Sequence, residues 1–161
     1  MRIERVGFDH TWQRELFVLD AATPADIPQH FSLSSEHFVC LLAWDAQIAS
    51  TVEISAVARR LLDGGAVYVV GWGADCGRVH DIVNENRKEV DGPVVMTTWH
   101  ESEELDDAIR FVLAAAVPDD GFQASCRSTL GIAIGSPGTA AQIRRAFANP
   151  ADFVHEQDAR G

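Results

Sequence analysis

Cysteine is scarce in this sequence, as are basic clusters and long apolar runs, and each scarcity excludes a class of protein. Cys40, Cys76 and Cys126 are widely spaced and odd in number, which excludes a disulfide framework and fits a reducing compartment. The apolar runs at 38–44 and 111–117 are far too short to cross a bilayer. The first residues hold acids, His and Gln where a signal peptide needs an apolar core. We therefore expect a cytoplasmic protein with no membrane partner.

Positive charge is the second deficit. The 161-residue chain has 13 Lys and Arg residues against 24 Asp and Glu residues, for a formal net charge of −11. Binding to nucleic acid needs a basic stripe that displaces counterions from phosphates. Pairs such as Arg59–Arg60 and Arg144–Arg145 stand alone. We therefore expect no nucleic-acid partner, and we interpret the acidity mainly as a source of solubility.

What the sequence does contain is an alternation of apolar strands and capped helices. Ser50 with Glu53 forms a capping box, Asp75 is placed to cap a second helix, and Ser136–Pro137 begins the last one. The pattern predicts one three-layer α/β domain with flanking helices, whose mainly parallel sheet has four to five strands in a flavodoxin-like or Rossmann-like order. The strands it predicts are uninterrupted apolar runs, as expected for strands buried on both faces: 38–44, 66–72, 94–99 and 129–135.

The two ends of the chain lack this alternation. Residues 1–37 predict an irregular N-terminal arm packed on the domain, in which 15–20 form a short edge strand. The α/β domain is placed at 38–153. Residues 154–161 are polar, and we expect a frayed C-terminal tail there. A domain of this length buries enough surface to fold without a disulfide or a metal.

Three of the predicted strands end in tryptophan. The carboxyl ends of parallel strands meet at one edge of the sheet, where open α/β sheets bind their ligands. A single tryptophan there is best explained as an apolar plug, since this residue is highly buried on average. Three at corresponding positions favour a binding surface for a small molecule or a protein partner; the oligomeric state is left open. The predicted ligand-binding residues are Trp44, Trp72, Trp99, Asp75, Glu101, Gly135, Ser136, Gly138 and Thr139.

The same edge holds the parts of a cysteine-dependent enzyme. Cys76 lies at a helix start, where the dipole lowers the pKa of a thiol, and His80 follows on the same helical face. With His100 oriented by Asp45 or Glu101, these residues would form the catalytic site of a hydrolase or transferase. No nucleophile signature surrounds Cys76, so a packed thiol is the simpler interpretation. The cysteine and the two histidines also lack the spacing of a zinc site, and we predict no metal.

Two glycine loops are candidate anion sites. Gly71–Gly77 resembles a dinucleotide fingerprint only loosely, because Trp72 and Asp75 stand where a pyrophosphate would lie. Gly135–Thr139 is better placed to hold the phosphate of a nucleotide-type ligand, since its amides lead into a helix N-terminus and it has no acid. Ser136–Pro137 alone explains this loop as a plain capped turn. No cofactor is predicted from either loop.

The runs GAVYVVGWGADCGRVHDIV (Gly65–Val83) and VVMTTWHESEELDDAIRFVL (Val94–Leu113) resemble a family of small bacterial proteins of unknown function. The resemblance covers about the central third of the chain. It implies a bacterial, cytosolic protein, and it implies no activity and no catalytic or binding residue.

Overall fold

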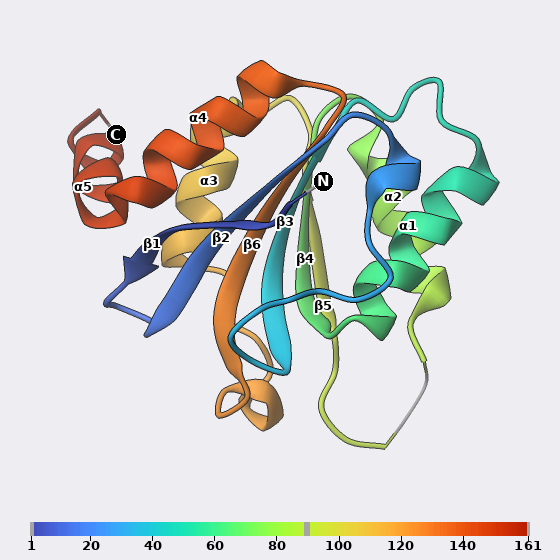
Figure 1. Ribbon diagram of the computed structural model, residues 1–161, viewed down its shortest axis with the longest axis horizontal. Coiled ribbons are helices and arrows are strands. Elements are labelled where there is room, and N and C mark those ends of the chain that lie inside the picture. Colours follow the sequence, from blue (N-terminus) through green and yellow to red (C-terminus); the bar gives the residue numbers. More distant parts are fainter. Residues whose placement is uncertain (1, 89–90, 161) are drawn as a thin grey trace.

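The strands of the chain assemble into one mixed sheet with the order β1-β2-β6-β3-β4-β5 (Figure 1). The computed structural model describes residues 2–88 and 91–160. β1 pairs with β2 in the antiparallel sense, and all other neighbours are parallel. The strands are β1 (Glu4–Asp9), β2 (Arg14–Ala21), β3 (His37–Trp44), β4 (Ala66–Trp72), β5 (Met96–His100) and β6 (Cys126–Ile134).

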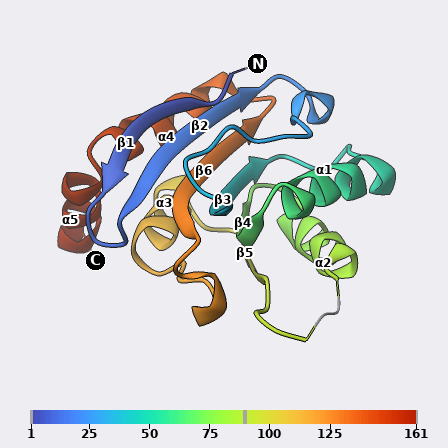
Figure 2. The same ribbon diagram turned by 60° about the horizontal axis from the view of Figure 1, so that its bottom comes forward.

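Helices cover both faces of the sheet, so the α/β class and its three layers are confirmed. α1 and α2 pack on one face, and α3 and α4 pack on the other (Figure 2). Each face has its own apolar core, because the side chains of the buried strands alternate between the two faces. The helices are α1 (Thr51–Asp63), α2 (Cys76–Asn86), α3 (Leu105–Ala114), α4 (Pro137–Ala148) and α5 (Pro150–Arg160), with 3-10 turns η1 (Pro24–Asp26) and η2 (Asp120–Phe122). None of the described helices is long and apolar enough to span a bilayer.

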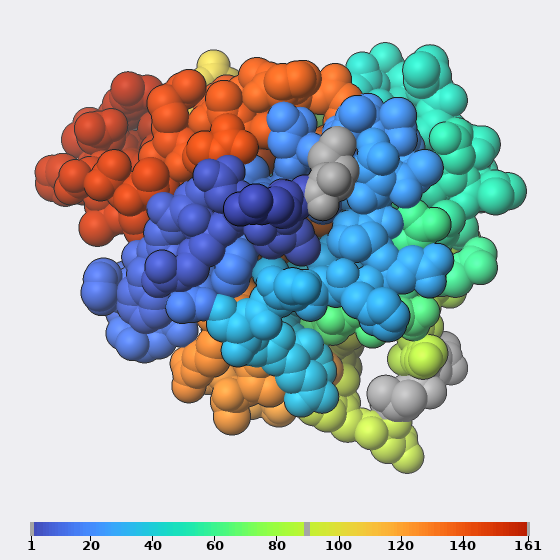
Figure 3. All heavy atoms as spheres, viewed as in Figure 1, coloured from blue at the N-terminus to red at the C-terminus, as the bar shows by residue number. Residues whose placement is uncertain are grey.

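The N-terminal residues belong to the sheet, which corrects the expected arm and the expected strand count. The sheet has six strands because β1 and β2 form a hairpin, and β2 lies between β1 and β6 and not at an edge. The irregular part is confined to 22–36, which lies across the front of the molecule beside α1 (Figure 3). Ile27 in this part is buried in the core under α1. At the C-terminal end, residues 154–160, which were expected to be frayed, belong to the helix α5.

The strand order differs from both expected orders. Counted along the chain, the five parallel strands have the order 1-5-2-3-4, whereas a flavodoxin-like sheet has 2-1-3-4-5 and a Rossmann-like sheet begins 3-2-1-4. The difference arises because α3 crosses back over β4 and β3 and inserts β6 beside β2. The chain leaves β4 toward α2 on one face and leaves β5 toward α3 on the other. The two loops therefore diverge, which is the arrangement that opens a binding crevice in such sheets.

Candidate functional site

Trp44 and Trp72 end β3 and β4, and Trp99 is the last residue but one of β5, yet the three side chains do not form one surface. In the ladders, Ala43 lies beside Trp72, and Gly71 lies beside Trp99. Each tryptophan is thus one residue out of register with the next, and a shift of one residue turns a side chain to the opposite face. Trp44 is 5% exposed and lies in the core under α1 and α2.

The other two indoles differ in what they contact. Trp72 packs against the core under α3, and its Nε1 donates to the carbonyl oxygen of Glu103 at 2.9 Å. Trp99 is 50% exposed, and its ring lies 4.4 Å from the ring of His80 on α2. The indole also lies over the first turn of α2, 3.9 Å from the position that a Cβ on Gly77 would take, which is an ordinary van der Waals distance. One face of the Trp99 indole is therefore packed against α2, and the other face is exposed.

The Cys76 thiol is packed inside the protein. Its residue is 1% exposed, and its Cβ lies against Gly71 of β4. Burial raises the pKa of the Cys76 thiol; a backbone hydrogen bond from His100 opposes this, and the charge of Glu101 raises the pKa further. The direction is opposite to the lowering of the pKa expected for a thiol at a helix start, and the loss of hydration on burial is its largest cause.

His100 is held by groups other than the thiol. Its Nδ1 lies 2.8 Å from Oε2 of Glu103, and its Nε2 lies 3.2 Å from Oγ1 of Thr98. Its ring also packs against Phe111 of α3, with 4.6 Å between centroids and the ring planes tilted by 53°. The carboxylate that orients His100 is therefore Glu103, in place of the expected Asp45 or Glu101. The signal in the sequence that could have identified Glu103 as this partner was an acid three residues after a histidine.

His80 also has partners for both ring nitrogens. Its Nδ1 lies 3.3 Å from Oδ1 of Asp81, and its Nε2 lies 3.3 Å from the side-chain amide of Asn84. The imidazole serves as the surface on which Trp99 packs. Neither histidine is thus arranged to take the proton of Cys76, and this geometry matches the packed-thiol interpretation.

This geometry predicts slow alkylation of Cys76. We expect the native thiol to react with iodoacetamide at least about tenfold more slowly than an unhindered thiol at neutral pH, because burial limits both access and thiolate. The rate should still be rising at pH values where an ordinary thiol is already fully ionised, since the raised pKa keeps Cys76 protonated at those pH values. Mass spectrometry of quenched samples would measure the rate, with urea-unfolded protein as the control. A native rate above that of the unfolded protein would contradict the packed thiol.

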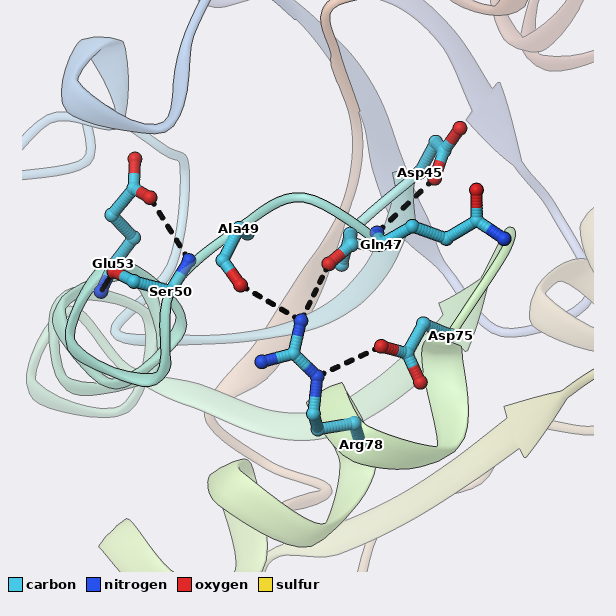
Figure 4. A network of polar contacts seen from close by, with 8 residues as sticks. Asp45, Gln47, Ala49, Ser50, Glu53, Asp75 and Arg78 are labelled. Carbon is cyan, nitrogen blue, oxygen red and sulfur yellow. Dashed lines mark hydrogen bonds and ion pairs between the residues drawn. The ribbon is translucent and has the colours of Figure 1, made fainter.

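Asp75 has a different role from the one its position suggested. Its φ is 64°, and its side chain makes no capping hydrogen bond to α2. Instead, its Oδ2 lies 2.8 Å from Nε of Arg78, and the same guanidinium donates to the carbonyl oxygens of Ala46 and Ala49 at 2.7 and 2.8 Å (Figure 4). Arg78, which no motif in the sequence marks, thereby fixes the loop after β3 to the start of α2.

The remaining predicted residues lie away from Trp99. Asp45 is exposed in the loop after β3, and its Oδ1 accepts from the backbone of Gln47 at 3.2 Å. Ser136 caps α4 by accepting from the backbone N–H of Thr139 at 3.2 Å, as predicted. The loop Gly135–Thr139 follows β6, which β3 separates from β4. This loop has the geometry of a capped turn, and it lies away from Cys76, His80 and His100.

This part of the edge holds no metal centre among the residues that the structure describes. Within 2–88 and 91–160, no group of three His, Cys, Asp or Glu side chains is arranged to hold a metal ion. A cavity of about 1220 Å³ opens at the opposite end of β5, lined by Asn84, Arg87, Val94 and Phe122 among others. It lies at the amino end of the strand, away from Trp99.

A sequence model of one protein family matches residues 16–150. These residues hold nearly all of β2 and every element from β3 to α4. The chain belongs to this family, Domain of unknown function (DUF7684). The matched DUF7684 region contains the carboxyl edge of all five parallel strands and leaves out β1 and nearly all of α5. The expected resemblance to a family of unknown function is thus confirmed. No curated protein matches the chain.

Proposed function

We propose that this protein is a non-catalytic module that binds a protein partner through the β5 edge surface, defined as Val94, Met96 and Trp99. Among the described residues, five large hydrophobic side chains are exposed, and these three of them belong to β5 or precede it by two residues. Trp99 points to the α2 side of the sheet and Met96, beside Tyr68, to the α3 side, so these residues form an exposed apolar row along the edge strand that a partner pairing with β5 would contact on both faces. Exposed apolar residues gathered in one place mark interaction sites, and tryptophan is enriched among the residues that dominate binding energy. Their concentration on one edge strand is the observation that carries the proposal.

The setting of Trp99 favours a protein over a small molecule. Small ligands are normally enclosed in concave pockets that bury most of their surface. Trp99 instead projects from an open strand, with one side of its ring against His80 and the other exposed. An indole that is already fixed in place loses little conformational entropy when a partner covers it.

The test replaces Trp99 with alanine. The immobilised wild-type protein and the Trp99→Ala variant are each incubated with extract of the source cells, and any protein retained by the wild type is purified and titrated against both. We expect the variant to bind that partner at least about 30-fold more weakly, the loss of a residue worth about 2 kcal/mol at an interface. The variant should lose about 1 kcal/mol of stability or less, because Trp99 is half exposed.

Ile48→Ala is the matched control. Ile48 is the most exposed large hydrophobic residue among those described, at 98%, and lies in the loop after β3 and not on the β5 edge surface. Its variant should bind the partner as the wild type does. A partner whose affinity is the same for all three proteins, or a ligand that stabilises wild type and Trp99→Ala equally, would overturn the proposal.

A further inference from the structure

β5 is an open edge of the sheet. β4 lies on one side of it, and no strand of the described residues lies on the other. Such an edge leaves backbone N–H and C=O groups free to pair with another chain. The strand, MTTWH, contains no proline, glycine, lysine or acid that would block pairing. The opposite edge strand, β1, is protected by charged Glu4 and Arg5 and by a register shift before Gly7.

Negative charge gathers at the carboxyl end of β5, beside the exposed indole. Asp81 is next to His80, against which Trp99 packs, and its side chain is 76% exposed. Glu101 follows the strand directly, and its charge reaches the thiol of Cys76 under the start of α2. A cationic side chain over Trp99 would be attracted both by these carboxylates and by the π face of the ring.

The amino end of β5 carries charges of both signs, because Oδ2 of Asp119 accepts from the backbone N–H of Val94 at 3.1 Å. Nη1 of Arg87 donates to the carbonyl oxygen of Val95 at 2.7 Å, which places a guanidinium beside the residue that precedes the strand. A cation on an added strand is therefore favoured near Trp99 and gains less near Val95, where the charges of Arg87 and Asp119 oppose each other. The edge thus combines a backbone pairing site with a charge preference at one end.

We propose that the open edge of β5 accepts an extended segment of a partner protein as an additional strand, with a Lys or Arg side chain lying over the exposed face of Trp99 and attracted by the carboxylates of Asp81 and Glu101. This inference rests on the proposed function and specifies the chemistry of the partner. β-strand addition of this kind draws affinity from backbone hydrogen bonds and specificity from alternate side chains. A second copy is a poorer occupant, because each chain carries a formal net charge of −11.

The test uses designed peptides and the full-length protein. The first peptide alternates Val and Thr and carries two lysines near one end; the second has Glu at the lysine positions; the third has the lysines and prolines at alternate positions, which block backbone pairing. Affinities are measured by fluorescence anisotropy, and protection of the β5 amides is measured by hydrogen exchange. We expect the lysine peptide to bind, to protect β5 and to weaken as salt rises.

Variants locate the contact. Trp99→Ala should weaken the lysine peptide about tenfold or more, through the lost stacking and cation–π contact. Glu101→Gln should weaken it about fivefold, the size of an exposed ion pair. Glu156→Gln, an exposed acid on α5, is the matched control and should change nothing.

Four results would overturn the inference: equal binding of the lysine and glutamate peptides, no effect of Trp99→Ala, binding of the proline peptide with no protection of β5, or a dimer of the protein alone with β5 protected. If the lysine peptide fails to bind while the extract yields a Trp99-dependent partner, this inference fails and the proposed function stands. If no Trp99-dependent partner exists, both fail.

Discussion

Replacing Gly73 with alanine is expected to lower the free energy of unfolding by about 3 kcal/mol or more. Gly73 has a φ of +119°, which side chains rarely adopt, and a Cβ there would meet the backbone carbonyl of Trp44 on the neighbouring strand. Because the obstacle is backbone, relief requires that the loop after β4 move away from β3. A loss of this size should lower the melting temperature by about 6–12 °C in a protein of this length.

Alanine variants of two other glycines distinguish the cost of the backbone conformation from the cost of the steric clash. Gly92 has a φ of +131° but no atom within 4 Å of the position that a Cβ would take, so Gly92→Ala should cost about 1–2 kcal/mol through the backbone alone. Gly138, in the first turn of α4, has open space and an ordinary φ, so its alanine variant should be neutral or more stable. Calorimetry or urea unfolding of the three variants would rank them. A Gly73→Ala loss no larger than that of Gly92→Ala would contradict the close contact with Trp44.

The buried strands could be predicted because local sequence determines them. β3 and β4 are continuous apolar runs, and such runs form strands covered on both faces. β1 could not be predicted, because its residues ERVGFD carry charges and a glycine and pair only through the hairpin with β2. The strand order depends on where α3 returns the chain, which is a long-range packing choice that no local pattern records.

The meeting of the strand ends at one edge was predicted, but the setting of the side chains there was not. The topology rule brings the ends of β3, β4 and β5 to one edge, as the structure has them. Whether an indole there is buried or open depends on register, and the one-residue offsets between Trp44, Trp72 and Trp99 are invisible in the separate strands. The burial of Cys76 likewise follows from α2 closing over Gly71, a contact between two elements.

Phe147→Ala is expected to remove about 3–5 kcal/mol of stability, because truncation of a buried phenylalanine loses its transfer free energy and leaves a cavity. Phe147 is fully buried near the end of α4, where its ring packs on Gly131 of β6. Phe153→Ala, in the partly buried α5, is the matched control and should cost less. The midpoint of urea unfolding would measure both, with Phe147→Leu as a milder variant should the alanine protein fail to fold.

The packing of Phe147 on Gly131 makes this prediction specific to the α4 face. A Cβ on Gly131 would press on the rings and methyls of Phe147 and Ile143, so Gly131→Ala alone should be destabilising. In the Phe147→Ala background the same methyl enters vacated space, and Ile143 is free to shift into the remainder. The cost of Gly131→Ala should therefore fall by about 1 kcal/mol or more in the double variant, as for residues in direct contact. Additive costs would show that the two side chains do not share one packed site, and that the α4 face is held by other contacts.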